Sequence, residues 1–213
     1  MKLTGEIEVP EPREVTLDPA KAAIVVIDME NEFCAPGGKK FIGTPAEEAV
    51  RAVAALIERG RQRGIPVLWV RSVREPNAPE FTVFRQSAHL IDGTWAVEYT
   101  SPLQARDGEP VFKKYCHDCF THTGLEQHLT NRHMMAPDWT MIVVGVALHV
   151  CVNHAVLGFS VRHYRTVLPL DCVAPRTGVG AAATLWRYGQ PAYAYNITVS
   201  NSDRIRFEAT TPD

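Results

Sequence analysis

The sequence predicts an α/β protein with three layers, in which a mostly parallel central sheet carries helices on both faces. Short apolar runs rich in β-branched residues recur along the chain, and each is too short for a helix. Such runs are typical of strands that are buried on both faces. Longer segments between them carry apolar residues at helical spacing. Strands that alternate with helices form βαβ units, and 213 residues suffice for one domain of this kind, 1–213.

The N-terminal part of the chain is expected to supply an arm and the first strand. Residues 1–20 are polar and rich in glutamate and proline, which indicates an extended N-terminal arm. AAIVVID, residues 22–28, is the first continuous apolar run and is interpreted as a buried strand. Pro36, Gly37 and Gly38 interrupt the segment that follows, so we expect a loop there.

The next segment carries the signals of a helix. Thr44 is a candidate N-cap, Pro45 suits the first helical position, and Glu47 completes a capping box. Gly64 stands where a C-terminal glycine is expected. The apolar run at 65–70 is interpreted as the second buried strand.

Residues 71–110 are less regular. Four prolines interrupt them, so we expect a long surface excursion, and a loop of this length usually has a function such as covering a site. VFKK, residues 111–114, is interpreted as a short strand. Residues 123–132 are expected to form a helix, with Thr123 and Glu126 as a second capping box.

The C-terminal part continues the alternation of strands and helices. The expected elements are a strand over 141–146, a helix over 147–164, a strand over 166–174, a helix over 177–188 closed by Gly189, and a last strand over 192–200.

Composition excludes several classes of protein. Lysine and arginine number 22 against 24 aspartates and glutamates, and no basic block stands out, so neither nucleic acid nor a membrane surface is an expected partner. No apolar run approaches the roughly 20 residues of a membrane span. The N-terminus lacks the apolar core of a signal peptide, so we expect a cytoplasmic protein. Five cysteines, an odd number, favour reduced thiols over a disulfide framework.

Candidate functional residues follow the ends of the strands, where parallel sheets place their sites. Asp28 ends the first strand and is either a loop carboxylate or a general base. Cys151 follows the strand at 141–146 at the start of a helix. It is either a small core residue or a nucleophile whose pKa the helix N-terminus and a nearby cation would lower. Lys114, at a strand end, is either a solvated charge or the group that favours the thiolate.

Three motifs together resemble those of the isochorismatase-like cysteine hydrolases. AAIVVIDMENEF is similar to the family's first strand with its aspartate, and VVGVALHVCV is similar to its strand, Gly-Val and Cys-Val. KYCHDCF matches the motif of a lysine followed six positions later by phenylalanine, which selects Lys114 over Lys113. The resemblance covers residues 22–171 and is nearest to the branch of N-carbamoylsarcosine amidases and ureidoacrylate amidohydrolases.

The resemblance implies the family's fold and a catalytic triad of Asp28, Lys114 and Cys151. It also implies a cis peptide at Val146–Ala147, with the backbone N–H groups of Ala147 and Cys151 forming an oxyanion hole. The implied enzyme is a cofactor-independent amidohydrolase. It cleaves a linear C–N bond of a small amide, ureido or N-carbamoyl compound through a thioester, with Asp28 moving the protons and activating the water. A homo-oligomer, dimer or tetramer, is expected.

The sequence departs from the family pattern at positions that line the pocket, namely Glu30, Glu32, Leu148 and His149. Nicotinamidases carry an Asp-x-His pair after the second strand, whereas this chain has WVRSVREPNAPEF, so no metal is expected. The substrate-binding residues are expected to be Phe33, Arg71, Trp95, Tyr115 and His149.

Four alternatives stay open. CHDCFTH, residues 116–122, is a candidate half of a zinc site. His154, three residues after Cys151, is a rival activator in a Cys–His dyad. The substrate could be another small amide, of the nicotinamide or maleamate type. The chain could also be a ligand-binding protein that retains the fold without catalysis.

Overall fold

Seven parallel strands form the centre of the computed structural model, which describes residues 7–209. Their order across the sheet is β4-β3-β2-β5-β6-β8, with β7 paired to β5, and each of these pairings is parallel. The strands are β2 (Ala22–Ile27), β3 (Val67–Ser72), β4 (Val111–Lys114), β5 (Thr140–Val146), β6 (Arg165–Pro169), β7 (Val173–Ala174) and β8 (Ile197–Ser200).

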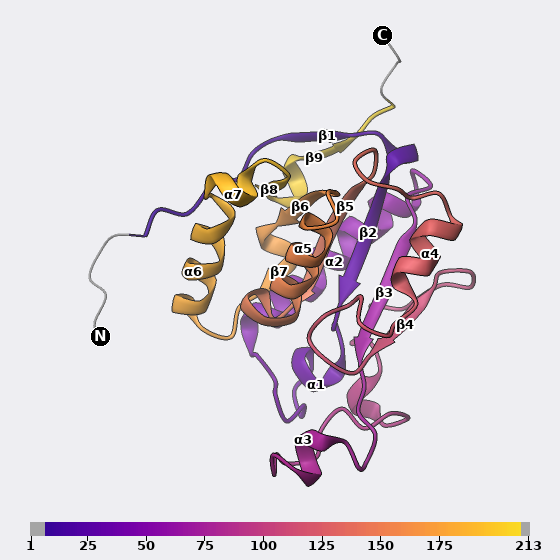
Figure 1. Ribbon diagram of the computed structural model, residues 1–213, viewed down its shortest axis with the longest axis vertical. Helices are drawn as coiled ribbons and strands as arrows, with labels where there is room; N and C mark the ends of the chain where they lie inside the picture. The colour runs from indigo at the N-terminus through magenta and orange to yellow at the C-terminus, as the bar shows by residue number, and fades with distance from the viewer. Residues whose placement is uncertain (1–6, 210–213) are drawn as a thin grey trace.

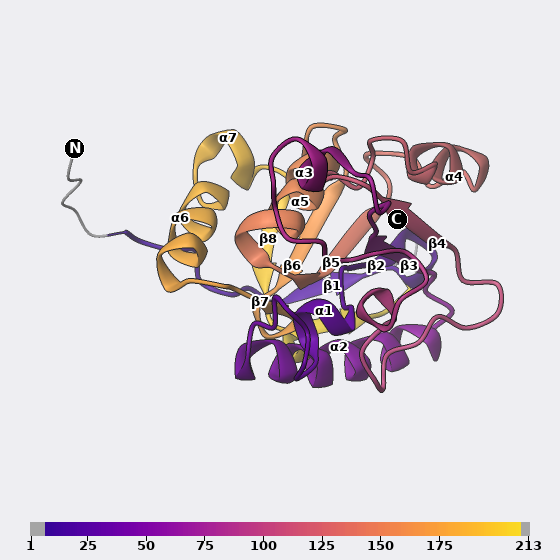
Figure 2. The same ribbon diagram turned by 90° about the horizontal axis from the view of Figure 1, so that it is seen from below.

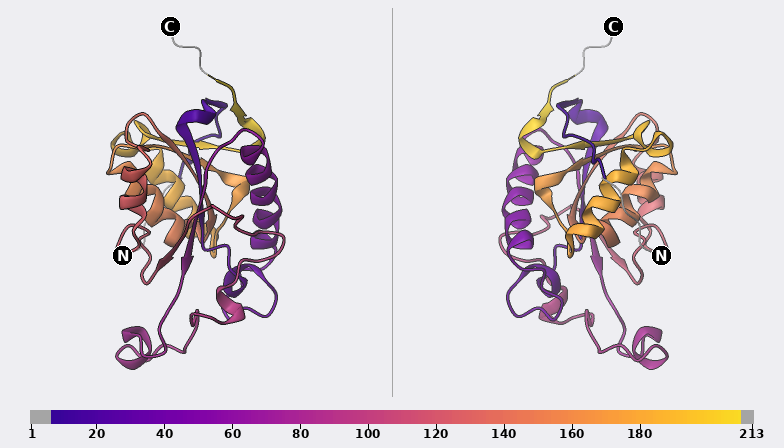
Figure 3. Two further views of the ribbon diagram at one scale, coloured as in Figure 1. Left: turned by 90° about the vertical axis from the view of Figure 1, so that its right-hand side faces the viewer. Right: turned by 90° about the vertical axis from the view of Figure 1, so that its left-hand side faces the viewer.

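Helices cover both faces of this sheet. The long helix α2 (Thr44–Arg61) covers one face, and α4 (Leu125–Asn131), α5 (Asn153–Ser160) and α6 (Gly178–Tyr188) cover the other (Figures 2 and 3). All six residues of β2 are buried. Ile24 and Val26 pack in the core on the α2 side, and Val25 and Ile27 pack in the core on the opposite side. Because β2 is buried on both sides, its sequence is a continuous apolar run. The helices on both faces of the parallel sheet confirm the predicted fold class.

Helix α2 begins one residue away from its predicted cap. Gly43 is the N-cap, with a φ of 88°, and Thr44 is already helical, so the predicted Thr44 cap is wrong. The predicted C-terminal glycine is confirmed. Gly64 has a φ of +71°; its N–H donates to the Arg61 carbonyl at 3.0 Å, and the Ile65 N–H donates to the Gly60 carbonyl at 3.0 Å. These two bonds form a Schellman motif, and glycine adopts its left-handed residue without a Cβ penalty.

Other boundaries also differ from the predictions. Helix α4 follows Gly124 in the left-handed conformation, so Thr123 is not its N-cap. The segment predicted as a loop contains the short helix α1 (Asn31–Cys34). The excursion 71–110 contains α3 (Pro79–Thr82) and the 3₁₀ turn η2 (Trp95–Val97), and α3 projects beyond the body of the molecule (Figure 1).

The C-terminal half departs from the predictions at three places. The helix expected from 147 begins as a π-helical turn, η3 (Leu148–Val152). The single strand expected over 166–174 is divided into β6 and β7 by the 3₁₀ turn η4 (Leu170–Cys172). The first half of the strand expected over 192–200 is instead the short helix α7 (Pro191–Ala194), because a proline suits the first turn of a helix and cannot donate to a sheet.

The N-terminal arm is more than an extended segment. Within it, β1 (Val15–Leu17) pairs in parallel with β9 (Ile205–Phe207), a C-terminal strand that the sequence did not indicate. Both strands have only three residues, too few for a periodic pattern to be visible. None of the helices within residues 7–209 is long and apolar enough to cross a membrane.

Candidate active site

The site lies where β2, β3, β4 and β5 end. Asp28 directly follows β2, has no exposed surface and adopts a φ of 52°, a left-handed conformation that aspartate tolerates better than most residues. Gly145 in β5 allows the close approach of the two strands. A Cβ atom on it would lie 1.9 Å from the Ile27 carbonyl oxygen. The turn that follows β5 is therefore held against the end of β2.

Asp28 forms a buried ion pair with Lys114, which also has no exposed surface. The Lys114 Nζ lies 2.8 Å from Asp28 Oδ2. Ser72, at the end of β3, links the two. Its Oγ accepts a hydrogen bond from Lys114 Nζ at 2.7 Å and donates one to Asp28 Oδ2 at 3.1 Å. Lys114 Nζ also donates to the Cys116 carbonyl at 3.2 Å. The ammonium group is thus held in one position by three acceptors.

Cys151 lies beside this pair, in η3. It is buried, and it lines the same cavity as Asp28. Its Sγ lies 3.4 Å from Nδ1 of His117, a residue of the loop after β4. The structure therefore brings together the three side chains that the sequence motifs select, and it adds an imidazole to them.

The charges of the site act on the ionisation of Cys151 and Lys114. Burial, followed by the Asp28 carboxylate, raises the pKa of Cys151 above its usual range, and Lys114 only partly opposes this. The sequence predicted a lowered pKa, and this is wrong because burial and the aspartate outweigh the cation. Burial also lowers the pKa of Lys114, but Asp28 and Cys151 together outweigh burial and raise it. Cys151 is therefore a thiol in the resting site.

A second buried carboxyl group, Glu30, lies next to Asp28. Burial, followed by the charge of Asp28, raises the pKa of Glu30 well above its usual value, which favours the protonated, uncharged form of this side chain. Its Oε2 accepts a hydrogen bond from the Ser72 N–H at 3.2 Å. Glutamine is common at this position in the resembling family, and a protonated glutamate has nearly the same shape and the same lack of charge.

The cavity above Cys151 has a volume of about 80 Å³ and is rich in cationic side chains. Lys40, Arg74 and Arg176 line it from three separate segments, together with His89. Lys40 Nζ lies 2.7 Å from His89 Nε2, and Arg74 is paired with Glu80 at 2.7 Å. The exposed Arg176 has no ion-pair partner among residues 7–209.

Of the five residues expected to bind substrate, only Phe33 lines this cavity. Arg71 Nη1 points to the Val97 carbonyl, at 3.4 Å. Trp95 and Tyr115 are exposed elsewhere, and His149 packs on α6, where a Cβ atom on Gly180 would touch its ring. Ala147, expected at the oxyanion hole, lines the cavity and follows a cis peptide from Val146, as the resemblance implied.

Two of the alternatives find no support in the geometry. His154 is exposed, and its Nδ1 lies 2.8 Å from the Val150 carbonyl, so the histidine that contacts Cys151 is His117. In the segment 116–122, Cys119 is buried in the core. Among the described residues, no three His, Cys, Asp or Glu side chains are grouped as metal ligands would be.

The positions of His117 and Ser72 beside Cys151 and Asp28, and the cationic lining of the cavity, were not predicted from the sequence. His117 stands three residues after Lys114, inside a segment that was interpreted through Lys114, Phe120 and a candidate zinc site, and not as a neighbour of Cys151. Ser72 is the last residue of β3, and its side chain lies on the side of the strand that faces Asp28. Since strand side chains alternate, the adjacent Arg71 faces the other way.

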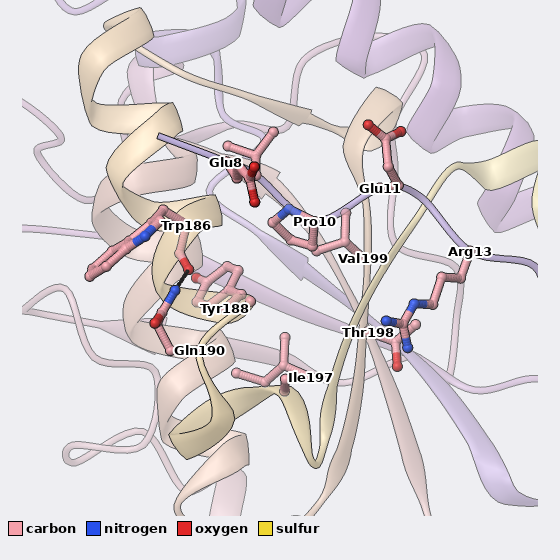
Figure 4. A pocket seen from close by; sticks show the side chains of 13 residues that line it. Glu8, Pro10, Glu11, Arg13, Trp186, Tyr188, Gln190, Ile197, Thr198 and Val199 are labelled. Atoms are coloured by element: carbon pink, nitrogen blue, oxygen red, sulfur yellow. Dashed lines mark hydrogen bonds between the residues drawn. The ribbon is translucent and has the colours of Figure 1, made fainter. Parts of the chain in front are cut away.

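A larger cavity of about 320 Å³ lies elsewhere, beneath the N-terminal arm (Figure 4). Trp186 and Tyr188 of α6 and Ile197 of β8 line it, with Pro10 and Glu11 of the arm. None of the triad residues lines this cavity. The smaller cavity is therefore the candidate active site.

Comparisons with known proteins identify the family of this chain. Residues 22–200 match the model of the isochorismatase domain. Ureidoacrylate amidohydrolase RutB of Methylobacterium radiotolerans is 25% identical over 181 residues, which cover 74% of this chain and 69% of that protein. The structure of N-carbamoylsarcosine amidase from Thermoplasma acidophilum is 28% identical with a TM-score of 0.71, and the match covers 86% of this chain and 97% of that one.

A further solved structure shares the fold at lower identity. Nicotinamidase PncA from Bacillus subtilis is 21% identical with a TM-score of 0.74, covering 85% of this chain and 99% of that one. Because the domain match spans most of the sequence, the chain belongs to the isochorismatase family. It is a hydrolase, as the resemblance implied.

Proposed function

We propose that this chain is a cysteine-dependent amidohydrolase that cleaves a linear C–N bond of a small ureido or N-carbamoyl compound bearing a carboxylate. The observation that carries the proposal is the Cys151 thiol at the floor of a small cavity, beside the buried ion pair of Lys114 and Asp28. The amidohydrolase relatives support the broader class, a hydrolase of non-peptide C–N bonds.

The mechanism begins with transfer of a proton. Asp28 accepts the proton of Cys151, and Lys114 stabilises the thiolate, which attacks the carbonyl carbon. The backbone N–H groups of Ala147 and Cys151 donate to the oxyanion, a contribution of about 3 kcal/mol per donor in comparable sites. Asp28 then gives the proton to the leaving nitrogen, which departs as ammonia or an amine. Water finally hydrolyses the thioester.

The cavity favours a small, anionic substrate. Its volume of about 80 Å³ is small compared with ligand sites of roughly 300–1,000 Å³. Lys40, Arg74 and Arg176 place three cations around it. Arg74 is neutralised by Glu80, whereas Arg176 offers an uncommitted guanidinium group at the exposed rim. Guanidinium groups bind carboxylates through paired hydrogen bonds.

A screen for ammonia release tests the proposed reaction. The purified protein and its Cys151→Ala variant are incubated in parallel with ureido acids, N-carbamoyl amino acids, nicotinamide and maleamate. We expect release from a ureido or N-carbamoyl acid and none from Cys151→Ala, with Cys172→Ala, a buried cysteine outside the site, as the matched control. Turnover by Cys151→Ala at the parental rate would exclude the mechanism, and turnover of nicotinamide or maleamate alone would exclude the substrate class.

A second variant tests the role of the carboxylate. Arg176→Gln should raise KM for an anionic ureido substrate by about 10- to 100-fold, the value of a charged hydrogen bond. The same variant should leave the KM of the matching neutral amide unchanged. An equal effect on both substrates would show that Arg176 does not bind the carboxylate.

A further inference from the structure

His117 is a basic group next to the nucleophile that the triad does not use. Its Nδ1 lies 3.4 Å from the Cys151 Sγ, within hydrogen-bonding range for sulfur. Its side chain lines the cavity and is exposed on the solvent side, in contrast to Asp28. Asp28 is thus closed off from solvent, whereas His117 joins the Cys151 sulfur to the solvent-exposed side of the cavity.

The surroundings of His117 keep its ring uncharged. Burial of part of the ring, then the cations nearby, lower its pKa below the ordinary histidine value of about 6.5, and a carboxylate opposes them weakly. The charged and titratable groups that face it are Lys114 after β4, His154 of α5, Arg74 after β3, Asp28 after β2 and Cys151 itself. An uncharged imidazole carries a hydrogen on only one of its two nitrogens, and in the tautomer with the hydrogen on Nε2 the Nδ1 lone pair faces the Cys151 Sγ.

Acylation changes what Nδ1 can do. Once Cys151 carries the acyl group it has no proton to donate, so the lone pair of Nδ1 is released beside the acyl carbon. This is the step at which a water molecule must lose a proton. Asp28 is less suited to that water, because it has no exposed surface, whereas His117 is exposed to solvent.

We propose, building on the function proposed above, that His117 is the general base that activates the water which hydrolyses the thioester. The water oxygen forms a bond to the acyl carbon while its proton moves to His117 Nδ1. The C–S bond breaks, and the sulfur leaves as a thiolate next to the Lys114 ammonium. The imidazolium then returns its proton to the sulfur across the same 3.4 Å contact. The two half-reactions thus use different bases, Asp28 for acylation and His117 for deacylation.

The experiment uses p-nitrophenyl acetate, a probe that acylates reactive thiols whatever the natural substrate is. His117→Asn keeps a hydrogen-bonding side chain but cannot take up the proton. We expect this variant to release about one equivalent of nitrophenolate in a burst and then to turn over about 100-fold more slowly than the parent, the value of a lost general base. Intact mass spectrometry should show acetyl-Cys151 accumulating. Hydroxylamine, a nucleophile that needs no base, should restore turnover.

His154→Asn is the matched control, because its ring is 5.6 Å from that of His117 and it does not contact the sulfur. It should show no burst beyond that of the parent. The parental deacylation rate should fall as pH falls through the His117 pKa, and the His117→Asn rate should not. His117→Gln, with a melting curve for each variant, separates a folding defect from a chemical one.

Two results would overturn the proposal. The first is a deacylation rate of His117→Asn equal to that of the parent. The second is a slowed burst with no acetyl-enzyme accumulating, which would place His117 in the acylation step. Failure of the proposed function is distinguishable, because then the parent itself would not be acetylated at Cys151.

Discussion

Each end of the central sheet holds an ion pair, and the two pairs have the same distance between nitrogen and oxygen. Only the pair at the carboxyl ends leaves a carboxylate oxygen without a hydrogen bond among the described residues. At the amino ends of the strands, Arg61 and Glu109 are 2.8 Å apart. At the carboxyl ends, Lys114 and Asp28 are also 2.8 Å apart. The first pair keeps 15% of each side chain exposed, and the second keeps none.

The two pairs differ in how many of the carboxylate oxygens accept hydrogen bonds. Both oxygens of Glu109 are occupied, by two nitrogens of Arg61, the Trp69 indole N–H at 2.7 Å and the Arg106 N–H at 2.9 Å. Asp28 uses only Oδ2, and its buried Oδ1 has no hydrogen-bond partner among the described residues. A buried, unsatisfied acceptor beside a thiol is costly for stability and available for proton transfer. Asp28 and Glu109 therefore differ in pairing: Glu109 has both oxygens hydrogen-bonded, and Asp28 keeps one oxygen free within residues 7–209.

The largest effect should come from breaking the carboxyl-end pair. Lys114→Met should reduce kcat by about 10²–10³-fold, since it removes the group that stabilises the thiolate. It should also destabilise the fold by roughly 3 kcal/mol, because Asp28 is left as an uncompensated buried charge. Steady-state kinetics and urea denaturation measure the two effects.

The double variant Asp28→Asn/Lys114→Met sharpens this result. Removing both charges should recover most of the lost stability and none of the activity. If the double variant were as unstable as Lys114→Met alone, the buried pair would be structural in the same sense as Arg61 and Glu109.

Glu30→Gln should have a smaller effect on activity, within about threefold or under 1 kcal/mol, because the amide matches the neutral acid in shape. Its stability should depend on pH differently from the parent. The folded-state pKa of Glu30 is raised, so the stability that Glu30 contributes is fully present below its unfolded pKa of about 4.3. It falls with rising pH by up to about 1.4 kcal/mol per unit until the folded pKa is passed.

Urea denaturation of parent and Glu30→Gln between about pH 5 and pH 8 measures that slope. The variant should gain stability relative to the parent as the pH rises. A constant difference across this range would mean that Glu30 is ionised in the folded protein.

Glu109→Gln should leave kcat unchanged, the smallest effect on activity of the three. It should cost about 2 kcal/mol of stability through its weakened hydrogen bonds. Burial alone would raise the Glu109 pKa, but the bonds from Arg61, the Arg106 N–H and Trp69 outweigh it and lower the pKa. The stability that Glu109 contributes is thus present above the unfolded value of about 4.3 and is lost as pH falls through the folded pKa. Denaturation curves in acid test this, and a loss of kcat at neutral pH would contradict it.

Much of the fold was predictable because the signal is local. The strands β2, β4 and β5 were predicted within one residue, since each is a short run whose composition alone identifies it. The pair β1 and β9 was not, because three-residue strands joined across most of the chain carry no periodicity. The predicted N-cap at Thr44 is wrong because Gly43 is the N-cap. The sequence pattern carries no information on the backbone conformation of Gly43.

The site was predictable to a different degree. Asp28, Lys114 and Cys151 were selected because three motifs occur in the family order. The structure brings these side chains together, and their catalytic role stays a prediction. The pocket residues were mostly misplaced, since the choice between Arg71 and its neighbour Ser72 depends on which side of β3 faces the site. The expected homo-oligomer and cytoplasmic location stay predictions.

Gly145 has a practical consequence for anyone redesigning this enzyme. A methyl group at this position would lie 1.9 Å from the Ile27 carbonyl oxygen and would push β5, the strand that leads to Cys151, away from β2. Libraries that aim at new substrates should therefore leave β2 and β5 untouched. They should vary Arg176 and the segment around His89, which approach the cavity from loops and can change without altering the spacing between sulfur and carboxylate.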